Sequence, residues 1–400
     1  MAIVKGGSSA PVPVSTVQTL GYGTTTSVLV REVGSKIFLL DPSKNPFTLL
    51  TSLAGSQPAT NPRFEWYEKG LRPKATQINN GGGYTDGEAG AMTVDNGLVF
   101  QINDIVYVPR TGEVARVSAS AATTVTWTSR GLGTTTAAAL LDNDDLFVIG
   151  SANVEGGDVG IPDEWQETQK YGLTQIFRRP FGVSRTRQGS EAYFGKPREQ
   201  IRGEKAVEHA IDIERAFMFG VKDEVTSGNS VFRTTDGFFA IATSNVTDFL
   251  GATLSEPDVE AVMEDVFLHT ASGDTRTLFA SASVVTAFDQ LGVDKLQLVP
   301  SDKTYGLAVR QYMTSHGTFN IVKNRLLEDG AGGTGTGDWA MIVDPKMLKL
   351  RPFSNGATRL LLDRQGPGVD GWVDEYLTEC GLQLTNPEVH GVLKNIGVPA

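Results

Sequence analysis

The segment from Gln166 to Gly220 constrains the fold of this chain more than any other, because a strand-forming stretch runs almost directly into one long charged helix. Residues Tyr171 to Ser184 are rich in aromatic and β-branched side chains, which favour strands. Pro197 suits the first turn of a helix, and no further proline occurs as far as Asp223. The pattern predicts a β-ribbon followed by a helix of some twenty residues, about 30 Å long.

This predicted ribbon is basic, and its charge allows two interpretations. Nucleic-acid contact would use exposed aromatic residues between the cations, and Phe177, Phe181 and Tyr193 stand in such positions. The chain as a whole carries a formal charge of -11, which argues against a dedicated nucleic-acid binder. Pairing with acidic patches on a neighbouring copy is therefore the favoured role of the four arginines, Arg178, Arg179, Arg185 and Arg187.

The predicted helix has an incomplete apolar stripe, formed by Ile201, Val207, Ala210, Ile211, Phe217 and Met218. Acidic and basic residues surround the stripe. One side of the helix is expected to pack, and the rest either faces solvent within one domain or meets another charged surface.

The 400 residues are enough for two or more domains or lobes. Residues 1–60 show little helical periodicity and predict an extended arm. Phe64 and Trp66 alternate with glutamates and predict a strand. A small β-barrel or sandwich at about 94–150 is expected inside a hairpin formed by segments 61–80 and 165–188, with strands at Leu98–Ile102, Ile105–Val108, Val114–Val117, Thr124–Thr128 and Leu146–Ile149.

From Gly228 onward the pattern becomes α/β. Ser255 is a good N-cap for a helix that extends to about His269, and Ser283–Leu291 predicts a second helix. Strands are expected at Thr277–Ala280, Leu307–Thr314 and Thr318–Lys323. A mostly antiparallel sheet is expected from the remaining strands, Trp339–Val343, Met347–Pro352, Ala357–Leu362 and Asp370–Leu384.

No catalytic motif is present, so we expect no enzyme, no cofactor and no metal site. The glycine-rich residues 330–337 lack a Gly-Lys-Ser/Thr ending, and Asp142–Asp145 lacks the spacing of a calcium loop, so surface turns are favoured for both. The four histidines are scattered, and surface or capping roles are expected for them. Asp374, Glu375 and Glu379 crowd one segment, where a charged sheet face or interface is favoured over acid catalysis.

The single cysteine, Cys380, excludes an intramolecular disulfide and is expected to fill apolar space in a strand. Residues 1–17 lack the pattern of a signal peptide, and no apolar stretch is long enough to span a membrane. A soluble intracellular product is therefore expected.

The order of these parts resembles the major capsid proteins of tailed double-stranded DNA phages with the Hong Kong 97-type fold. Particular motifs share this resemblance: Phe64-Glu65-Trp66, Val108-Pro109-Arg110-Thr111-Gly112-Glu113, Gly189-Ser190, Thr304-Tyr305-Gly306, Asp374-Glu375-Tyr376-Leu377-Thr378-Glu379, Gly381-Leu382 and Asn386-Pro387-Glu388. The resemblance covers nearly the whole chain and implies an N-terminal arm (1–60), an extended loop with the β-insertion (61–190), a spine helix (191–227), an axial lobe (228–343) and peripheral strands (344–400).

The same resemblance implies a subunit that assembles into pentamers and hexamers of an icosahedral shell in the host cytoplasm, encloses packaged double-stranded DNA, and meets scaffold, decoration and portal proteins. With the four arginines, the candidates for contact between subunits are Phe64, Trp66, Glu375 and Glu379. Two alternatives remain open: another virion or shell protein (a decoration, tail or nanocompartment subunit), and a hydrolase that uses Asp374 or Glu375.

Overall fold

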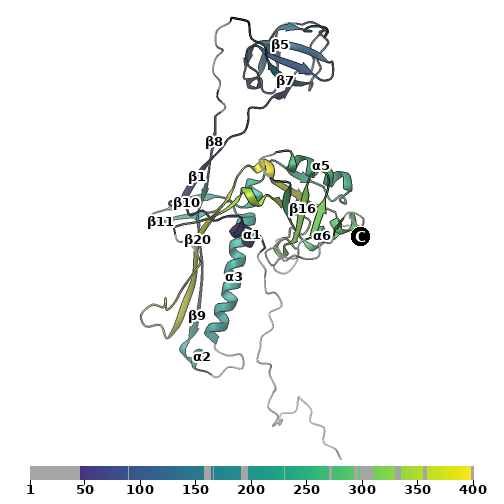
Figure 1. Ribbon diagram of the computed structural model, residues 1–400. Coiled ribbons are helices and arrows are strands. Elements are labelled where there is room, and N and C mark those ends of the chain that lie inside the picture. The colour runs from purple at the N-terminus through teal and green to yellow at the C-terminus, as the bar shows by residue number, and fades with distance from the viewer. Residues whose placement is uncertain are drawn as a thin grey trace, which may run out of the picture.

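The computed structural model describes residues 46–88, 90–156, 164, 166–190, 197–228, 230–269, 273–291, 296–297, 310–328, 335–354 and 358–397. Figure 1 shows four parts: a small β-module that contains β5 and β7, a stem that carries it, a long ribbon beside helix α3, and a lobe that contains α5, α6 and β16. The architecture is α+β, as predicted.

Two successive ribbons share one continuous run of chain. Strand β1 (Arg63–Glu68) pairs antiparallel with β8 (Thr168–Leu173) to form the stem. Strand β9 (Gln175–Ser184) then changes partner and pairs antiparallel with β20 (Gly371–Leu384). The predicted hairpin of 61–80 with 165–188 is therefore right only for the stem. The change of partner occurs opposite Pro62. The Pro62 carbonyl still accepts a hydrogen bond from the Thr174 N–H at 2.8 Å, but proline has no N–H with which to continue the β1–β8 pairing.

The β-module is a six-stranded sheet with the order β2-β7-β4-β5-β6-β3. Its strands are β2 (Ala75–Gln77), β3 (Ala91–Thr93), β4 (Asp104–Val108), β5 (Glu113–Ala121), β6 (Thr124–Arg130) and β7 (Asp145–Ser151). The inserted β-structure is confirmed, but it begins at Ala75 rather than near residue 94. The strand predicted at Leu98–Ile102 is wrong: Asn96 caps a 3₁₀ turn, η1 (Gly97–Val99), and the Gly97 backbone lies too close to the Ala121 carbonyl for a side chain.

The long helix is confirmed. Helix α3 (Pro197–Phe219) has 23 residues and runs beside β9, which Figure 1 also shows. A short helix, α2 (Arg185–Gly189), precedes it. The predicted stripe is only partly right, because most of its N-terminal members are half-buried. The fully buried side chains cluster in the second half of α3 and include two polar residues, His209 and Glu214.

The last part of the predicted arm, residues 46–60, is not an extended segment. Residues Pro46–Ala54 form helix α1, which packs in the same core as α3 through Phe47 and Leu50. Parallel bridges from Ser56 to Leu350 and from Ala59 to Phe353 continue this attachment. Phe47, Leu50 and Thr51 stand at i, i+3 and i+4 and form the buried face of this helix, where the Thr51 hydroxyl donates to the Phe47 carbonyl at 2.8 Å. Residues 1–45 lie outside the described part of the chain.

The lobe is built on a seven-stranded sheet with the order β12-β21-β17-β13-β16-β15-β14. Helices α5 (Glu256–Phe267) and α6 (Ala282–Leu291) confirm both predicted helices, and the Ser255 N–H donates to the Asp258 carboxylate, 3.1 Å, at the start of α5. The strands are β12 (Val246–Asp248), β13 (Thr275–Ala280), β14 (Leu296–Gln297), β15 (Arg310–Met313), β16 (Thr318–Lys323), β17 (Ala340–Val343) and β21 (Gly391–Lys394).

Two strands of this sheet depart from the prediction. Strand β17, expected in the terminal antiparallel sheet, lies between β13 and β21, where all four of its residues are buried. Strand β21 returns from the predicted peripheral segment 344–400 to pair with β17 and β12. An unbroken apolar strand such as β17 needs cover on both faces, and two separate hydrophobic cores provide it: Met341 and Val343 belong to one, and Ala340 and Ile342 to the other.

The remaining strands confirm the terminal sheet. Strand β20 pairs antiparallel with β18 (Leu348–Pro352), β19 (Arg359–Leu361) and β9. Within the range predicted for the spine helix, β10 (Asp223–Ser227) instead forms a hairpin with β11 (Ser230–Thr234). The other short elements are α4 (Phe238–Ile241), η3 (Arg325–Leu327), η4 (Pro345–Met347) and η5 (Pro387–Val389).

Candidate assembly surface

The ribbon of β9 and β20 has two chemically different faces. Phe177, Phe181 and Val183 alternate along β9 toward the protein core and are buried. The intervening side chains, including Ile176 and Arg178, are exposed. Since Phe177 and Phe181 lie in the core, they do not present the exposed stacking platform expected of a nucleic-acid site, and Tyr193 falls outside the described residues.

Arg179 belongs to the inner face of the ribbon. Its guanidinium Nη2 lies 2.5 Å from Asp212 Oδ2, and its Nε lies 3.7 Å from Glu208 Oε2, both on α3. This side chain therefore fastens β9 to the helix within one chain.

Arg178 lies on the outer side of β9, and Arg185 and Arg187 are exposed on α2, which follows β9 directly. Two of these three arginines find acidic neighbours on or beside β20. Arg178 Nε is 3.3 Å from Glu375 Oε1, and Arg185 Nε is 2.9 Å from Asp370 Oδ1. The two guanidinium side chains remain 59% and 74% exposed, so each retains most of its capacity for a further partner. Arg187 is exposed and has no ion-pair partner among the described residues.

The acidic cluster on β20 divides in the same way. Asp374 is buried on the side of α3, where Arg198 Nε donates to it at 2.8 Å and Arg202 Nη2 at 3.2 Å. The hydrogen bonds from Arg198 lower the pKa of Asp374 to about 2. A permanently ionised carboxylate between two guanidinium groups is a structural anchor and a poor general acid.

The other acidic candidates are also engaged within the chain. Glu375 is 8% exposed and carries the contact to Arg178, while Glu379 accepts a hydrogen bond from the Thr174 hydroxyl at 3.2 Å. The sequence analysis did not predict that Arg198 and Arg202 are the basic partners of Asp374. The available signal was the spacing of these two arginines, which stand four residues apart at the start of the predicted helix and therefore on one helix face.

Phe64 and Trp66 stack on one another at a centroid distance of 6.0 Å. Phe64 is 7% exposed and sits over two glycines, Gly172 and Gly381, where an added Cβ would lie 2.5 Å and 2.9 Å from ring atoms of Phe64. Trp66 Nε1 donates to Glu68 Oε1 at 2.8 Å. The structure thus places Phe64 in the packing at the base of the stem, and only Trp66 is partly accessible.

The described residues contain no group of three or more His, Cys, Asp or Glu side chains arranged to hold a metal ion. Within Asp142–Asp145, Asp144 is buried and pairs with Arg110 at 2.5 Å.

Two histidines are buried, which corrects the surface roles expected for them. His209 contacts Thr378 Oγ1 at 2.7 Å, and burial lowers the pKa of His390 to about 3. Burial raises the pKa of the Cys380 thiol to about 12, in keeping with a space-filling role.

No helix among the described residues is long and apolar enough to cross a membrane.

The decisive comparison is with a family model described as the SU10 major capsid protein, which matches residues 16–397. The chain belongs to the SU10 major capsid protein family. The chain is also 23% identical over 379 residues to the major capsid protein of Pseudomonas phage PaMx41, and this match covers 88% of each sequence. Its role is therefore structural, as a capsid subunit, rather than enzymatic.

Solved structures show a more distant similarity to this SU10-family chain. One from Gordonia phage Cozz has a TM-score of 0.49 and 12% identity, covering 92% of this chain and 91% of its own. The capsid of a native GTA particle has a TM-score of 0.48 and 11% identity, covering 92% and 96%. The family assignment rests on the family model, and the order of stem, insertion, spine helix and lobe agrees with the predicted Hong Kong 97-type fold.

Proposed function

We propose that this capsid subunit assembles with copies of itself into pentamers and hexamers that close an icosahedral shell around packaged double-stranded DNA. Assembly would take place in the host cytoplasm, with scaffold, decoration and portal proteins as further partners. No catalytic activity is part of this proposal. Membership of the major capsid protein family carries it, and the exposed ribbon and projecting module support it.

The outer face of the ribbon supports a contact between subunits. Arg178 stands on the outer side of β9, whose inner side packs against α3, and Arg185 and Arg187 stand exposed on α2 at the end of the same strand. The chain as a whole is acidic, so a neighbouring copy offers many carboxylates to this basic face. A subunit with a net charge of -11 attracts DNA only weakly, and this property suits a shell that encloses DNA without binding it tightly.

Charge reversal at Arg185 and Arg187 tests the contact. Arg187 has no ion pair among the described residues, and the pair of Arg185 with Asp370 is exposed on both sides, so it contributes less than about 1 kcal/mol. The variant Arg185→Glu/Arg187→Glu should therefore melt like the wild type but lose sedimenting assemblies. Arg178 and Arg179 are left unchanged, because their reversal would oppose Glu375 and Asp212 inside the chain.

The matched control is Arg185→Lys/Arg187→Lys, which keeps both charges at the same positions. It should assemble, and sedimentation velocity of the two variants gives the comparison. Normal shells from the glutamate variant would rule out this basic surface at the end of the ribbon as a required contact.

A further inference from the structure

Glu214 joins three elements of the fold with one buried side chain. It lies on α3, is 0% exposed, and accepts hydrogen bonds from the N–H groups of Phe47 at 3.3 Å and Thr48 at 3.4 Å. The amide Nδ2 of Asn324, which follows β16, donates to the same carboxylate at 2.8 Å. Because Phe47 and Thr48 occupy the first turn of α1, Glu214 caps the N-terminus of that helix.

The three groups that donate to Glu214 are all neutral. Helix α1 contains no charged residue, and the cations on the nearby parts of α3, β16, η3 and η4 are exposed at the surface: Arg215, Lys323, Arg325 and Lys346. On β18, which also packs against α1, Lys349 is half-buried and the buried Arg351 donates to Gln383. Burial without a facing cation disfavours the ionised carboxylate. Burial raises the pKa of Glu214 to about 7, and the hydrogen bonds from Asn324, Phe47 and Thr48 oppose this rise in part.

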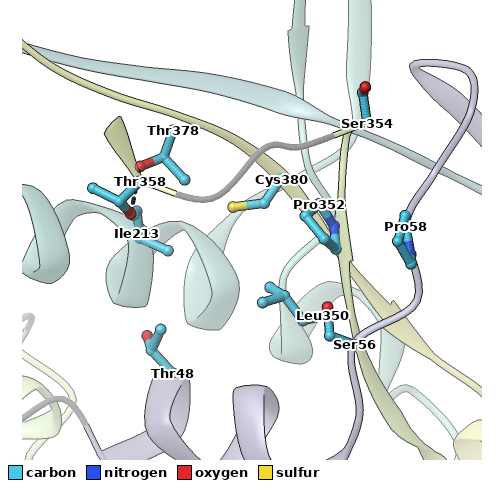
Figure 2. A pocket seen from close by; sticks show the side chains of 10 residues that line it. All are labelled: Thr48, Ser56, Pro58, Ile213, Leu350, Pro352, Ser354, Thr358, Thr378 and Cys380. Atoms are coloured by element: carbon cyan, nitrogen blue, oxygen red, sulfur yellow. Dashed lines mark hydrogen bonds between the residues drawn. The ribbon is translucent and has the colours of Figure 1, made fainter. Parts of the chain in front are cut away.

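The contact between α1 and α3 is also incompletely filled. Thr48 on α1 and Ile213 on α3 line one cavity of about 380 Å³, which Figure 2 shows together with Leu350 and Cys380 from the sheet side. Glu214 directly follows Ile213 in the helix. This space allows water to enter beside α1, or α1 to shift, without displacing the rest of the core.

We propose that Glu214 is a proton-controlled latch whose neutral form holds α1 against α3. In the opened junction the carboxyl is solvated and regains its ordinary pKa, so closing takes up a proton between the two pKa values. Lower pH therefore favours the closed junction, and higher pH favours the open one. The latch is a property of the folded chain and does not depend on the proposed shell contacts.

Hydrogen exchange at the backbone amides of α1 tests the latch in full-length subunits and in assembled particles. After correction for the intrinsic pH dependence of exchange, protection of Leu50–Ala54 should fall about tenfold between pH 6 and pH 8. In Glu214→Gln, which keeps the shape but cannot ionise, protection should stay constant across this range. The control Glu204→Gln removes a half-buried carboxylate from the same helix and should behave like the wild type.

A second variant keeps the test decisive if Glu214→Gln does not fold. Asn324→Ala removes the donor at 2.8 Å that stabilises the ionised carboxylate, so the midpoint of the protection change should move to higher pH. Flat protection in the wild type, an unchanged pH response in Glu214→Gln, or an unmoved midpoint in Asn324→Ala would each overturn the proposal.

Discussion

Asp374 illustrates how a residue that suggests catalysis in the sequence can serve only structure. Its side chain is 1% exposed, and Arg198, at 20%, is mostly buried beside it. Two arginines from α3 neutralise the carboxylate, so the first turns of the helix are tied to the first part of β20. The pair thereby orients the long helix along the ribbon.

Replacement of this carboxylate has a predictable cost. The pKa of Asp374 is lowered in the folded chain, so its stabilisation is complete above about pH 4 and is lost as pH falls toward 2. Asp374→Asn should lower the free energy of unfolding at pH 7 by about 2 kcal/mol, and the difference from the wild type should narrow to about half at pH 3. Urea unfolding followed by tryptophan fluorescence measures both values.

Asp363 provides the control for this prediction. It also contacts Arg198, at 2.8 Å, but its side chain is 57% exposed. Asp363→Asn should change stability by less than about 1 kcal/mol. An equal decrease in the free energy of unfolding for Asp374→Asn and Asp363→Asn would contradict the claim that burial makes the Asp374 contacts the stronger ones.

At the scale of elements, the β-module has its own hydrophobic core. Val106, Val117 and Val125 are 0% exposed within it, and this core shares no residue with the two cores of the main body. The module's first and last strands are adjacent, with Ala75 opposite Phe147, so the chain enters and leaves close to one place. These features predict independent folding of the module.

Val106→Asp tests that independence. A buried unpaired carboxylate should unfold the module, while α3 and the lobe keep their structure, because their cores are separate. Limited proteolysis should then cleave within residues 75–151 only. Tyr107→Asp, at the next and outward-facing position, should remain resistant, and cleavage throughout the Val106→Asp chain would contradict the separation.

Local patterns predicted elements better than their partners. Proline at Pro197 and the capping residues at Ser255 identified α3 and α5, because helix signals lie within a few residues of one another. The pairing of β9 with β20 was not foreseen, since it joins segments nearly two hundred residues apart and depends on register. The ion pair of Arg179 with Asp212 was not foreseen either, because it depends on how α3 packs on β9, although alternation along a strand places neighbours such as Arg178 and Arg179 on opposite faces.

At the scale of the whole molecule, the chain is extended in a way that one subunit alone does not explain. Figure 1 shows the module held away from the lobe on the stem, and the β9–β20 ribbon and α3 reaching in the opposite direction. Surfaces of this kind gain cover from neighbouring copies, and many modest contacts together can close a stable shell. This geometry accords with the family's role as a capsid subunit.

Negative-stain electron microscopy of the purified protein, combined with sedimentation velocity, tests the central claim most directly. The account predicts rings with five or six subunits, or closed shells tens of nanometres across, formed by the full-length chain alone or with a co-expressed scaffold protein. A uniform monomer or small oligomer under both conditions would contradict self-assembly into a shell.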